Sequence, residues 1–197
     1  LQLSVTAEEQ ARLKLHCGGQ LHVLLEYIDS TKVNTDVFQR LAVDLENHNR
    51  VSRIVDLNNG VISAAAESSE DAVVIEGSRM THSLSPMYRL LILGAGDVAK
   101  FVAEMAIALD YDVTLCDPLP NYLDNWHVPG VETTAQLPDD VVRERFSNPY
   151  SGIMALAHDP RVDDMALREA LKTNAFYIGA MGSIKTSAAR RERLPEL

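Results

Sequence analysis

Two glycine-rich turns and one acid are the residues best suited to bind a ligand. The first turn reads Gly94-Ala-Gly96-Asp-Val-Ala99, after a short apolar run and before an apolar helical pattern. This is the G-x-G-x-x-A pattern of a dinucleotide site. Its glycines permit a tight turn and a close approach to a pyrophosphate, and its third small residue packs helix on strand. The N–H groups that begin the following helix then favour an anion.

An acid follows at the spacing that such a site needs. Asp117 ends the next apolar strand, about 20 residues after the glycines, where it could accept a hydrogen bond from a ribose hydroxyl. The alternative is that the glycines only turn the chain and that Asp117 is a solvated strand end. The pattern predicts a Rossmann-like fold. Bound nucleotide is a separate hypothesis, because a fold does not fix a function.

A histidine and a second glycine turn follow later strands. His158 stands at a strand end, and Gly179, Gly182 and Ser183 connect another strand to a helix. His158 could hydrogen-bond a phosphate or act as acid or base. Alternatively, it caps the next helix or packs beneath a loop. The second turn could hold another anion, or Ser183 is simply the N-cap of its helix.

A thiol and two aromatic rings complete the candidates. Cys17 precedes two glycines, and a soft thiolate there could meet a metal or a dithiolene cofactor. A lone cysteine is more often a small buried residue. Tyr122 and Trp126 lie in the loop after Asp117, where either could cover an adenine or pterin ring or plug the end of the sheet.

Alternating strands and helices must position these residues. From residue 88 onward, the pattern predicts an α/β fold, a Rossmann-like doubly wound parallel sheet with right-handed crossovers. We expect the strand order 3-2-1-4-5, with ligand at the carboxyl ends beside the switch point between strands 1 and 4. That order would gather both glycine turns, Asp117 and His158 around one crevice. The predicted strands span about 89–93, 112–116, 131–134, 152–157 and 176–179, and the helices about 97–109, 138–146, 163–172 and 184–193.

The residues before this alternation predict a small α+β segment. Asn58-Asn59-Gly60 between two apolar runs is a strong hairpin signal. Residues 77–87, rich in serine, suggest a linker. The remaining predictions are strands at 21–27, 51–57, 61–65 and 73–76 and a helix at about 36–46.

Composition excludes several classes of protein. A net charge of −10 argues against non-specific DNA or RNA binding, which needs clustered Lys and Arg. No apolar run reaches the ~18 residues that cross a bilayer, and no signal peptide is visible. The 2 cysteines do not make a disulfide framework. We therefore expect a soluble cytoplasmic protein, and, because Leu1 is not a Met, part of something longer.

Together these motifs resemble the XdhC/CoxI family, accessory proteins of xanthine dehydrogenase and related molybdenum hydroxylases. The likeness spans nearly the whole chain and implies three segments. Residues 1–30 would be the tail of the family's N-terminal domain, 31–87 a helix, hairpin and linker, and 88–197 the Rossmann-like domain. The matching motifs are Cys17-Gly-Gly19 with Glu26, residues 93–99, Cys116-Asp-Pro118 with Tyr122, Ala157-His-Asp-Pro160 with Asp163, Asp164 and Leu167, and residues 177–183 with Arg190 and Leu194.

The resemblance implies a cofactor-insertion chaperone rather than an enzyme, with no catalytic residue assigned. Such a protein binds molybdenum cofactor (molybdopterin), protects it during sulfuration and delivers it to a xanthine dehydrogenase-like apo-enzyme. Cys17 would contact the metal end. The resemblance is also compatible with a cysteine desulfurase as a partner, with a homodimer and with NAD(P) as a ligand. An NAD(P)-dependent oxidoreductase and a nucleotide-binding regulatory module are the alternatives. The expected cofactor-binding residues are Gly94, Gly96, Asp97, Asp117, His158, Gly179, Gly182 and Ser183.

Overall fold

The computed structural model describes residues 2–4, 8, 11–12, 20–28, 32–65 and 71–194. Contacts divide the chain into two compact units, one of Leu1–Asp44 with Val51–Leu84 and one of Leu45–Arg50 with Ser85–Leu197. The second unit, which we call the Rossmann unit, contains both glycine turns. None of the helices in the described ranges is both long enough and apolar enough to cross a bilayer.

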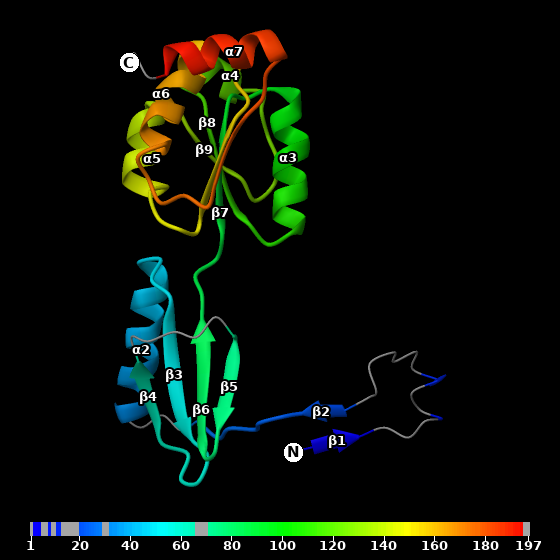
Figure 1. Ribbon diagram of the computed structural model, residues 1–197, viewed down its shortest axis with the longest axis vertical. Helices are drawn as coiled ribbons and strands as arrows, with labels where there is room; N and C mark the ends of the chain where they lie inside the picture. Colours follow the sequence, from blue (N-terminus) through cyan, green and yellow to red (C-terminus); the bar gives the residue numbers. More distant parts are fainter. Residues whose placement is uncertain are drawn as a thin grey trace. The chain divides into compact units, whose positions relative to one another are not determined.

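A parallel sheet of 5 strands forms the centre of the Rossmann unit, in the order β11-β10-β7-β8-β9 (Figure 1). This is the predicted order of strands 3-2-1-4-5, seen from the other edge. Every residue of the central strand β7 is buried, as expected of a parallel strand covered on both faces. The strands are β7 (Arg89–Leu93), β8 (Asp112–Cys116), β9 (Glu132–Thr134), β10 (Ser151–Ala155) and β11 (Tyr177–Ala180).

Helices lie on both faces of this sheet and divide the core in two. Leu90 and Ile92 of β7 pack with the alanines of α3 (Asp97–Ala108), whereas Leu91 and Leu93 pack beneath α5 (Pro138–Arg145) and α6 (Pro160–Ala170). Figure 1 shows α3 across the sheet from α5 and α6. A short α4 (Pro120–Leu123) and the last helix, α7 (Ile184–Arg193), complete the unit.

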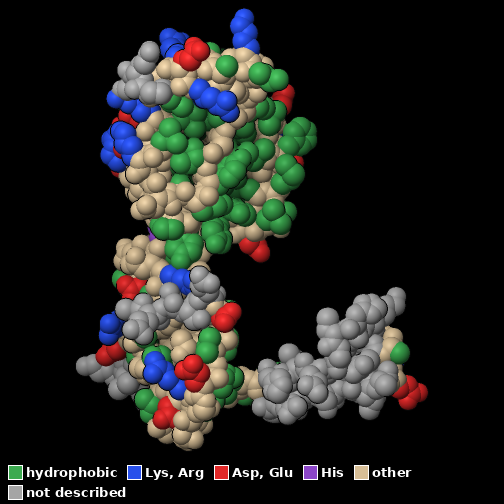
Figure 2. All heavy atoms as spheres, viewed as in Figure 1, with side chains coloured by type: hydrophobic (Ala, Val, Ile, Leu, Met, Phe, Trp, Pro, Cys, Tyr) green, Lys and Arg blue, Asp and Glu red, His purple; other side chains and the backbone are tan. Residues whose placement is uncertain are grey.

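A stripe of apolar side chains on α3 is exposed. Val98, Phe101 and Met105 of α3 and its C-cap Leu109 recur every three or four residues and are 44% to 71% exposed. Figure 2 shows hydrophobic side chains gathered over the Rossmann unit. Because the alanines of α3 pack on the sheet from another side, α3 is apolar over most of its circumference, a pattern typical of a helix covered on both sides. The described residues leave this stripe uncovered.

The N-terminal unit contains an antiparallel sheet of 4 strands, ordered β4-β3-β6-β5, and the helix α2 (Lys32–Glu46). The predicted hairpin is confirmed, since β3 (Val51–Asp56) and β4 (Ile62–Ala65) pair across Asn58-Asn59-Gly60. The sheet is completed by β5 (Val73–Glu76) and β6 (Arg79–Leu84). A separate antiparallel pair consists of β1 (Gln2–Ser4) and β2 (Gln20–His22).

Two local predictions for this unit were wrong. Residues 77–87 are not a linker, because β6 lies within them and pairs with both β3 and β5. One of the serines that suggested a linker, Ser83, is part of β6, and its hydroxyl is buried 3.2 Å from that of Ser52 on β3. The strand predicted at 21–27 ends at His22.

Candidate functional site

A cavity of about 260 Å³ opens at the carboxyl edge of the parallel sheet. It lies beside the ends of β7, β8 and β10, where the topology places the switch point. Three of the predicted site residues, Gly94, Asp117 and His158, line it. Its lining is Gly94, Ala95, Asp117, Leu119, Tyr122, Ala157, His158, Asp159 and Val162.

Gly94 is the point at which two turns of this edge meet. Its φ of +92° favours glycine, and a Cβ there would lie 2.7 Å from the Ala157 nitrogen. The turn after β7 therefore packs directly on the turn after β10. Gly96 has an ordinary φ of −94°, and a Cβ there would lie 3.4 Å from Nε2 of His158. The imidazole of His158 thus lies over the start of α3.

Asp117 holds the first glycine turn in place. Its Oδ2 accepts a hydrogen bond from the Ala95 N–H at 3.0 Å, and its Oδ1 accepts one from the Leu119 N–H at 3.0 Å. The side chain is only 7% exposed. The alternative of a solvated strand end was therefore wrong. Because both carboxylate oxygens already accept a backbone N–H, a ligand hydroxyl would have to share one of these oxygens. A contact between Asp117 and a ribose stays a prediction.

Each strand of the parallel sheet is followed by a helix that begins at this edge, and the N-termini of these helices differ in capping. In α6 the Asp159 carboxylate accepts from the Arg161 N–H at 2.9 Å. In α7 the Ser183 hydroxyl accepts from the Thr186 N–H at 3.1 Å, as the N-cap alternative proposed. The N-cap of α3 is Gly96, which has no side chain to cap the helix. The helix α3 therefore has no side-chain acceptor for its first backbone N–H groups, and the same holds for α4 and α5, whose N-caps are Leu119 and Leu137.

The second glycine turn does not line the cavity. Gly182 and Ser183 are exposed at the start of α7, and a Cβ on Gly179 would meet the ring of Tyr177. The observed cavity thus includes Gly94 and Ala95 of the first turn, Asp117 and His158, as predicted. Residues 179–183, which the prediction placed in the same crevice, do not line it. Ligand contact by Gly179, Gly182 and Ser183 stays a prediction.

Acidic and aromatic side chains set the character of this edge. Asp97 is exposed in the first turn of α3, and Asp159 joins Asp117 in the cavity wall. Tyr122 lines the cavity and is half exposed. Trp126 instead plugs the sheet, because it is buried and its indole N–H donates to the Gly96 carbonyl at 3.3 Å. The site thus offers carboxylate acceptors beside the backbone donors of α3.

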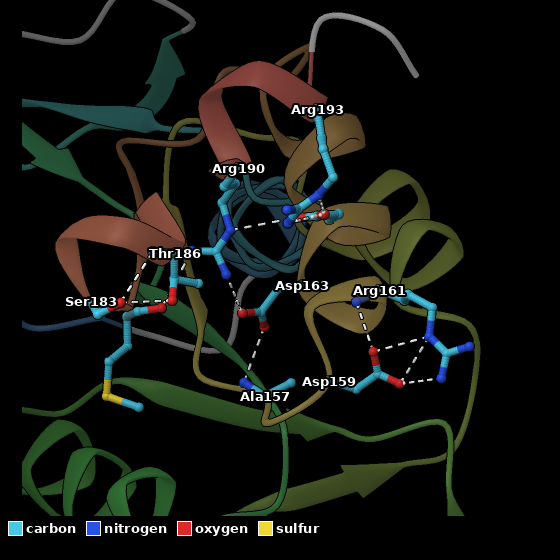
Figure 3. A network of polar contacts seen from close by, with 10 residues as sticks. Ala157, Asp159, Arg161, Asp163, Ser183, Thr186, Arg190 and Arg193 are labelled. Carbon is cyan, nitrogen blue, oxygen red and sulfur yellow. Dashed lines mark hydrogen bonds and ion pairs between the residues drawn. The ribbon is translucent and has the colours of Figure 1, made fainter. Parts of the chain in front are cut away.

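A buried ionic network lies behind the cavity wall (Figure 3). Arg190 of α7 donates to Asp163 at 2.7 Å and to Asp164 at 3.3 Å, both on α6. Arg193 adds a second ion pair to Asp164 at 2.8 Å. Burial raises the pKa of Asp163 to about 6, against the opposing effect of Arg190. The site prediction did not include this network, although paired acids on one helix and arginines three apart on the next carry its signal.

No cysteine within the described residues belongs to a candidate metal site. Cys17, the predicted metal ligand, lies outside them. Cys116 is fully buried, and burial raises its thiol pKa to about 12. In the ranges that the structure describes, no cluster of three or more His, Cys, Asp or Glu side chains could hold a metal ion.

Comparisons with known proteins match the Rossmann unit and most of the chain. The family model of the XdhC Rossmann domain matches residues 90–197. The molybdenum cofactor insertion chaperone PaoD of Escherichia coli K12 is 29% identical over 183 residues, which are 93% of this chain and 49% of PaoD. A crystal structure of a xanthine dehydrogenase from Bacillus halodurans superposes with a TM-score of 0.70 at 20% identity.

The chain spans only part of these relatives. It spans about half of PaoD, and the Bacillus halodurans superposition covers 97% of this chain and 64% of that one. At 20% identity, the structural likeness supports the fold alone.

Proposed function

This chain belongs to the XdhC family through its Rossmann domain, and from that premise we propose that it binds molybdenum cofactor as cargo. We propose further that it delivers the cofactor to a molybdenum hydroxylase of the xanthine dehydrogenase type. The insertion activity named for PaoD supports this role. The chain would hold and transfer a ligand rather than turn over a substrate of its own.

One observation carries the proposal, namely the N-terminus of α3 beside the cavity. Its backbone N–H groups have no side-chain cap and are suited to a phosphate. Away from these donors, the carboxylates at Asp97, Asp117 and Asp159 can accept hydrogen bonds from the amino and ring N–H groups of a pterin. One edge thus offers donors for the phosphate end of the cofactor and acceptors for its pterin.

The size of the cavity fits one end of such a ligand. Sites that enclose a whole small molecule occupy roughly 300–1,000 Å³, whereas this cavity measures about 260 Å³. The remainder of the cofactor would stay outside, accessible to the enzyme that receives it. We propose Cys17 as a contact for the molybdenum end, since a thiolate suits a soft metal centre. Sulfuration before delivery would make a cysteine desulfurase a second partner.

The test is equilibrium binding of molybdopterin, NADH and NADPH, each identified by mass spectrometry. We expect molybdopterin to bind, and Gly96→Val to weaken that binding at least about tenfold, because the branched side chain displaces His158 from the start of α3. Gly182→Val should have little effect, since Gly182 lies outside the cavity lining. A larger loss with Gly182→Val than with Gly96→Val would move the phosphate to the second turn.

Transfer is tested separately by activating apo xanthine dehydrogenase with loaded protein. We expect wild type to restore activity, and Cys17→Ser to reduce transfer more than binding. Full activation by both Gly96→Val and Cys17→Ser would remove the case for this site. Tight NADH binding with hydride transfer, and no molybdopterin binding, would favour the oxidoreductase alternative.

A further inference from the structure

We propose that Arg190 and Asp163 are positioning residues that tie the two turns after β10 and β11 together and thereby set the shape of the cavity. The inference rests on the proposed function only in treating this cavity as the ligand site. Arg190 and Asp163 are absent from the cavity lining. Any effect on ligand therefore passes through the backbone that they hold.

The hydrogen bonds form a continuous path across this edge of the sheet. Arg190 donates from Nη1 to the Met181 carbonyl, in the turn after β11, at 3.3 Å. Its Nη2 donates to Oδ2 of Asp163 at 2.7 Å. The other oxygen of Asp163 accepts from the Ala157 N–H, in the turn after β10, at 3.0 Å. Figure 3 shows the guanidinium between the two turns.

The path ends at the cavity itself. Ala157 lines the cavity and precedes His158 and Asp159, which line it too. Ala157 also lies against Gly94 with no space for even a Cβ between them. Because packed backbone does not yield without a shift of its neighbours, a displaced Ala157 moves both the His158 turn and the Gly94 turn.

The choice of charged residues favours a positioning role. Arg190 and Asp163 are 6% and 1% exposed, and burying such charges carries a large desolvation penalty that apolar residues of similar volume avoid. If these residues served only to pack α7 on α6, apolar side chains would suffice. A guanidinium fork, however, can bond two carboxylates and a carbonyl at once, and Asp163 can hold a backbone N–H at the same time. Arg193, also on α7, pairs with Asp164 rather than with either turn in the described part of the chain, which makes it a matched control.

The experiment compares Arg190→Lys with Arg193→Lys in the whole chain, using the backbone amide resonances of Ala157 and Gly94 as reporters. A lysine at 190 keeps the charge but cannot make all three contacts. We expect Arg190→Lys to shift both resonances and to weaken molybdopterin binding about tenfold. Arg193→Lys should leave both resonances and the binding unchanged. Unchanged resonances in Arg190→Lys, or equal shifts in both variants, would overturn the inference.

A measurement on wild type covers the case in which Arg190→Lys does not fold. The groups facing Asp163 are Asp164 on its own helix, Arg190 from α7 and the Ala157 amide. We expect the Ala157 and Gly94 amides to titrate together near pH 6, and Asp163→Asn to abolish the shared titration. Separate midpoints would refute the coupling. If the resonances behave as expected but wild type binds no molybdopterin, the positioning role stands and the proposed function fails.

Discussion

The backbone of Ala157 packs against Gly94 so closely that a Cβ on Gly94 would lie 2.7 Å from the Ala157 nitrogen. The two residues belong to turns that follow adjacent parallel strands, β10 and β7. The Ala157 turn can therefore keep its position in the cavity wall only because residue 94 has no side chain.

Gly94→Ala should destabilise the Rossmann unit strongly. The new methyl group combines a left-handed φ of +92° with a backbone clash, and we expect a loss of about 2 to 4 kcal/mol in the free energy of unfolding. Gly96→Ala, at an ordinary φ, should cost less than about 1 kcal/mol. Urea denaturation followed by Trp126 fluorescence measures both. Equal stability of the two variants would contradict the packing described here.

Asp117→Ala should loosen the first glycine turn. It removes the acceptor of the Ala95 and Leu119 N–H groups, so the free energy of unfolding should fall by about 2 to 3 kcal/mol. Asp124→Ala, at an exposed acid soon after in the chain, should change it by less than about 0.5 kcal/mol. Hydrogen exchange of the Ala95 amide is the local readout. Unchanged protection in Asp117→Ala would show that the carboxylate does not hold this turn.

If a dinucleotide binds, NAD(H) should bind more tightly than NADP(H). A carboxylate at Asp117 repels a 2′-phosphate but accepts from a free 2′-hydroxyl. Calorimetric titration of both dinucleotides into wild type and into Asp117→Ala measures the ratio of the two affinities. We expect this ratio to be smaller in Asp117→Ala than in wild type. Tighter NADP(H) binding by wild type would place the ribose away from Asp117.

The stability of wild type relative to Asp163→Asn should depend on pH. Burial raises the pKa of Asp163 from 3.8 to about 6. The folded state therefore holds a proton that the unfolded state has lost, and the stability from this group is present below about pH 4 and lost as pH rises through about 6. Over that range, wild type should lose about 2 to 3 kcal/mol relative to the variant. A constant difference would mean that the Ala157 hydrogen bond and Arg190 together offset the effect of burial on the pKa, and a difference of opposite sign would mean that they outweigh it.

Cys116 should resist alkylation in the folded protein. Its side chain is fully buried and its pKa is raised to about 12, so almost no thiolate exists at pH 8. The chain has 2 cysteines, and Cys17→Ser therefore leaves Cys116 as the single thiol. Iodoacetamide followed by mass spectrometry should modify this variant only after denaturant is added. Rapid modification of the native variant would show that this side of the sheet opens readily.

The arrangement of the Rossmann unit follows from local signals in the sequence. The turn at Gly94, the strand ending at Asp117 and the strand before His158 each occupy the predicted place, because apolar periodicity and glycine spacing act over a few residues. The structure brings these three residues to one cavity. The sheet topology alone required them to meet, since carboxyl ends of parallel strands share an edge.

What the sequence could not reveal depends on distant pairings. The strand β6 was missed because Ser83 finds a buried partner, Ser52, that lies 31 residues away. Arg190 and Asp163 are 27 residues apart. Read alone, Arg190 is one of several arginines on a polar helix. Only the packing of α7 on α6 distinguishes it from its neighbours.

The central strand of the parallel sheet has one partner that is near in the sequence and one that is distant. β7 pairs on one side with β8, which follows after a single helix, and on the other with β10, whose Ser151 aligns with Arg89. During synthesis the first pair can form early, whereas the second requires closure of a long loop. The Ala157 wall of the cavity follows β10. A nascent chain therefore acquires its glycine turn long before it acquires a cavity, because the lining is complete only once the chain has been synthesised through Val162.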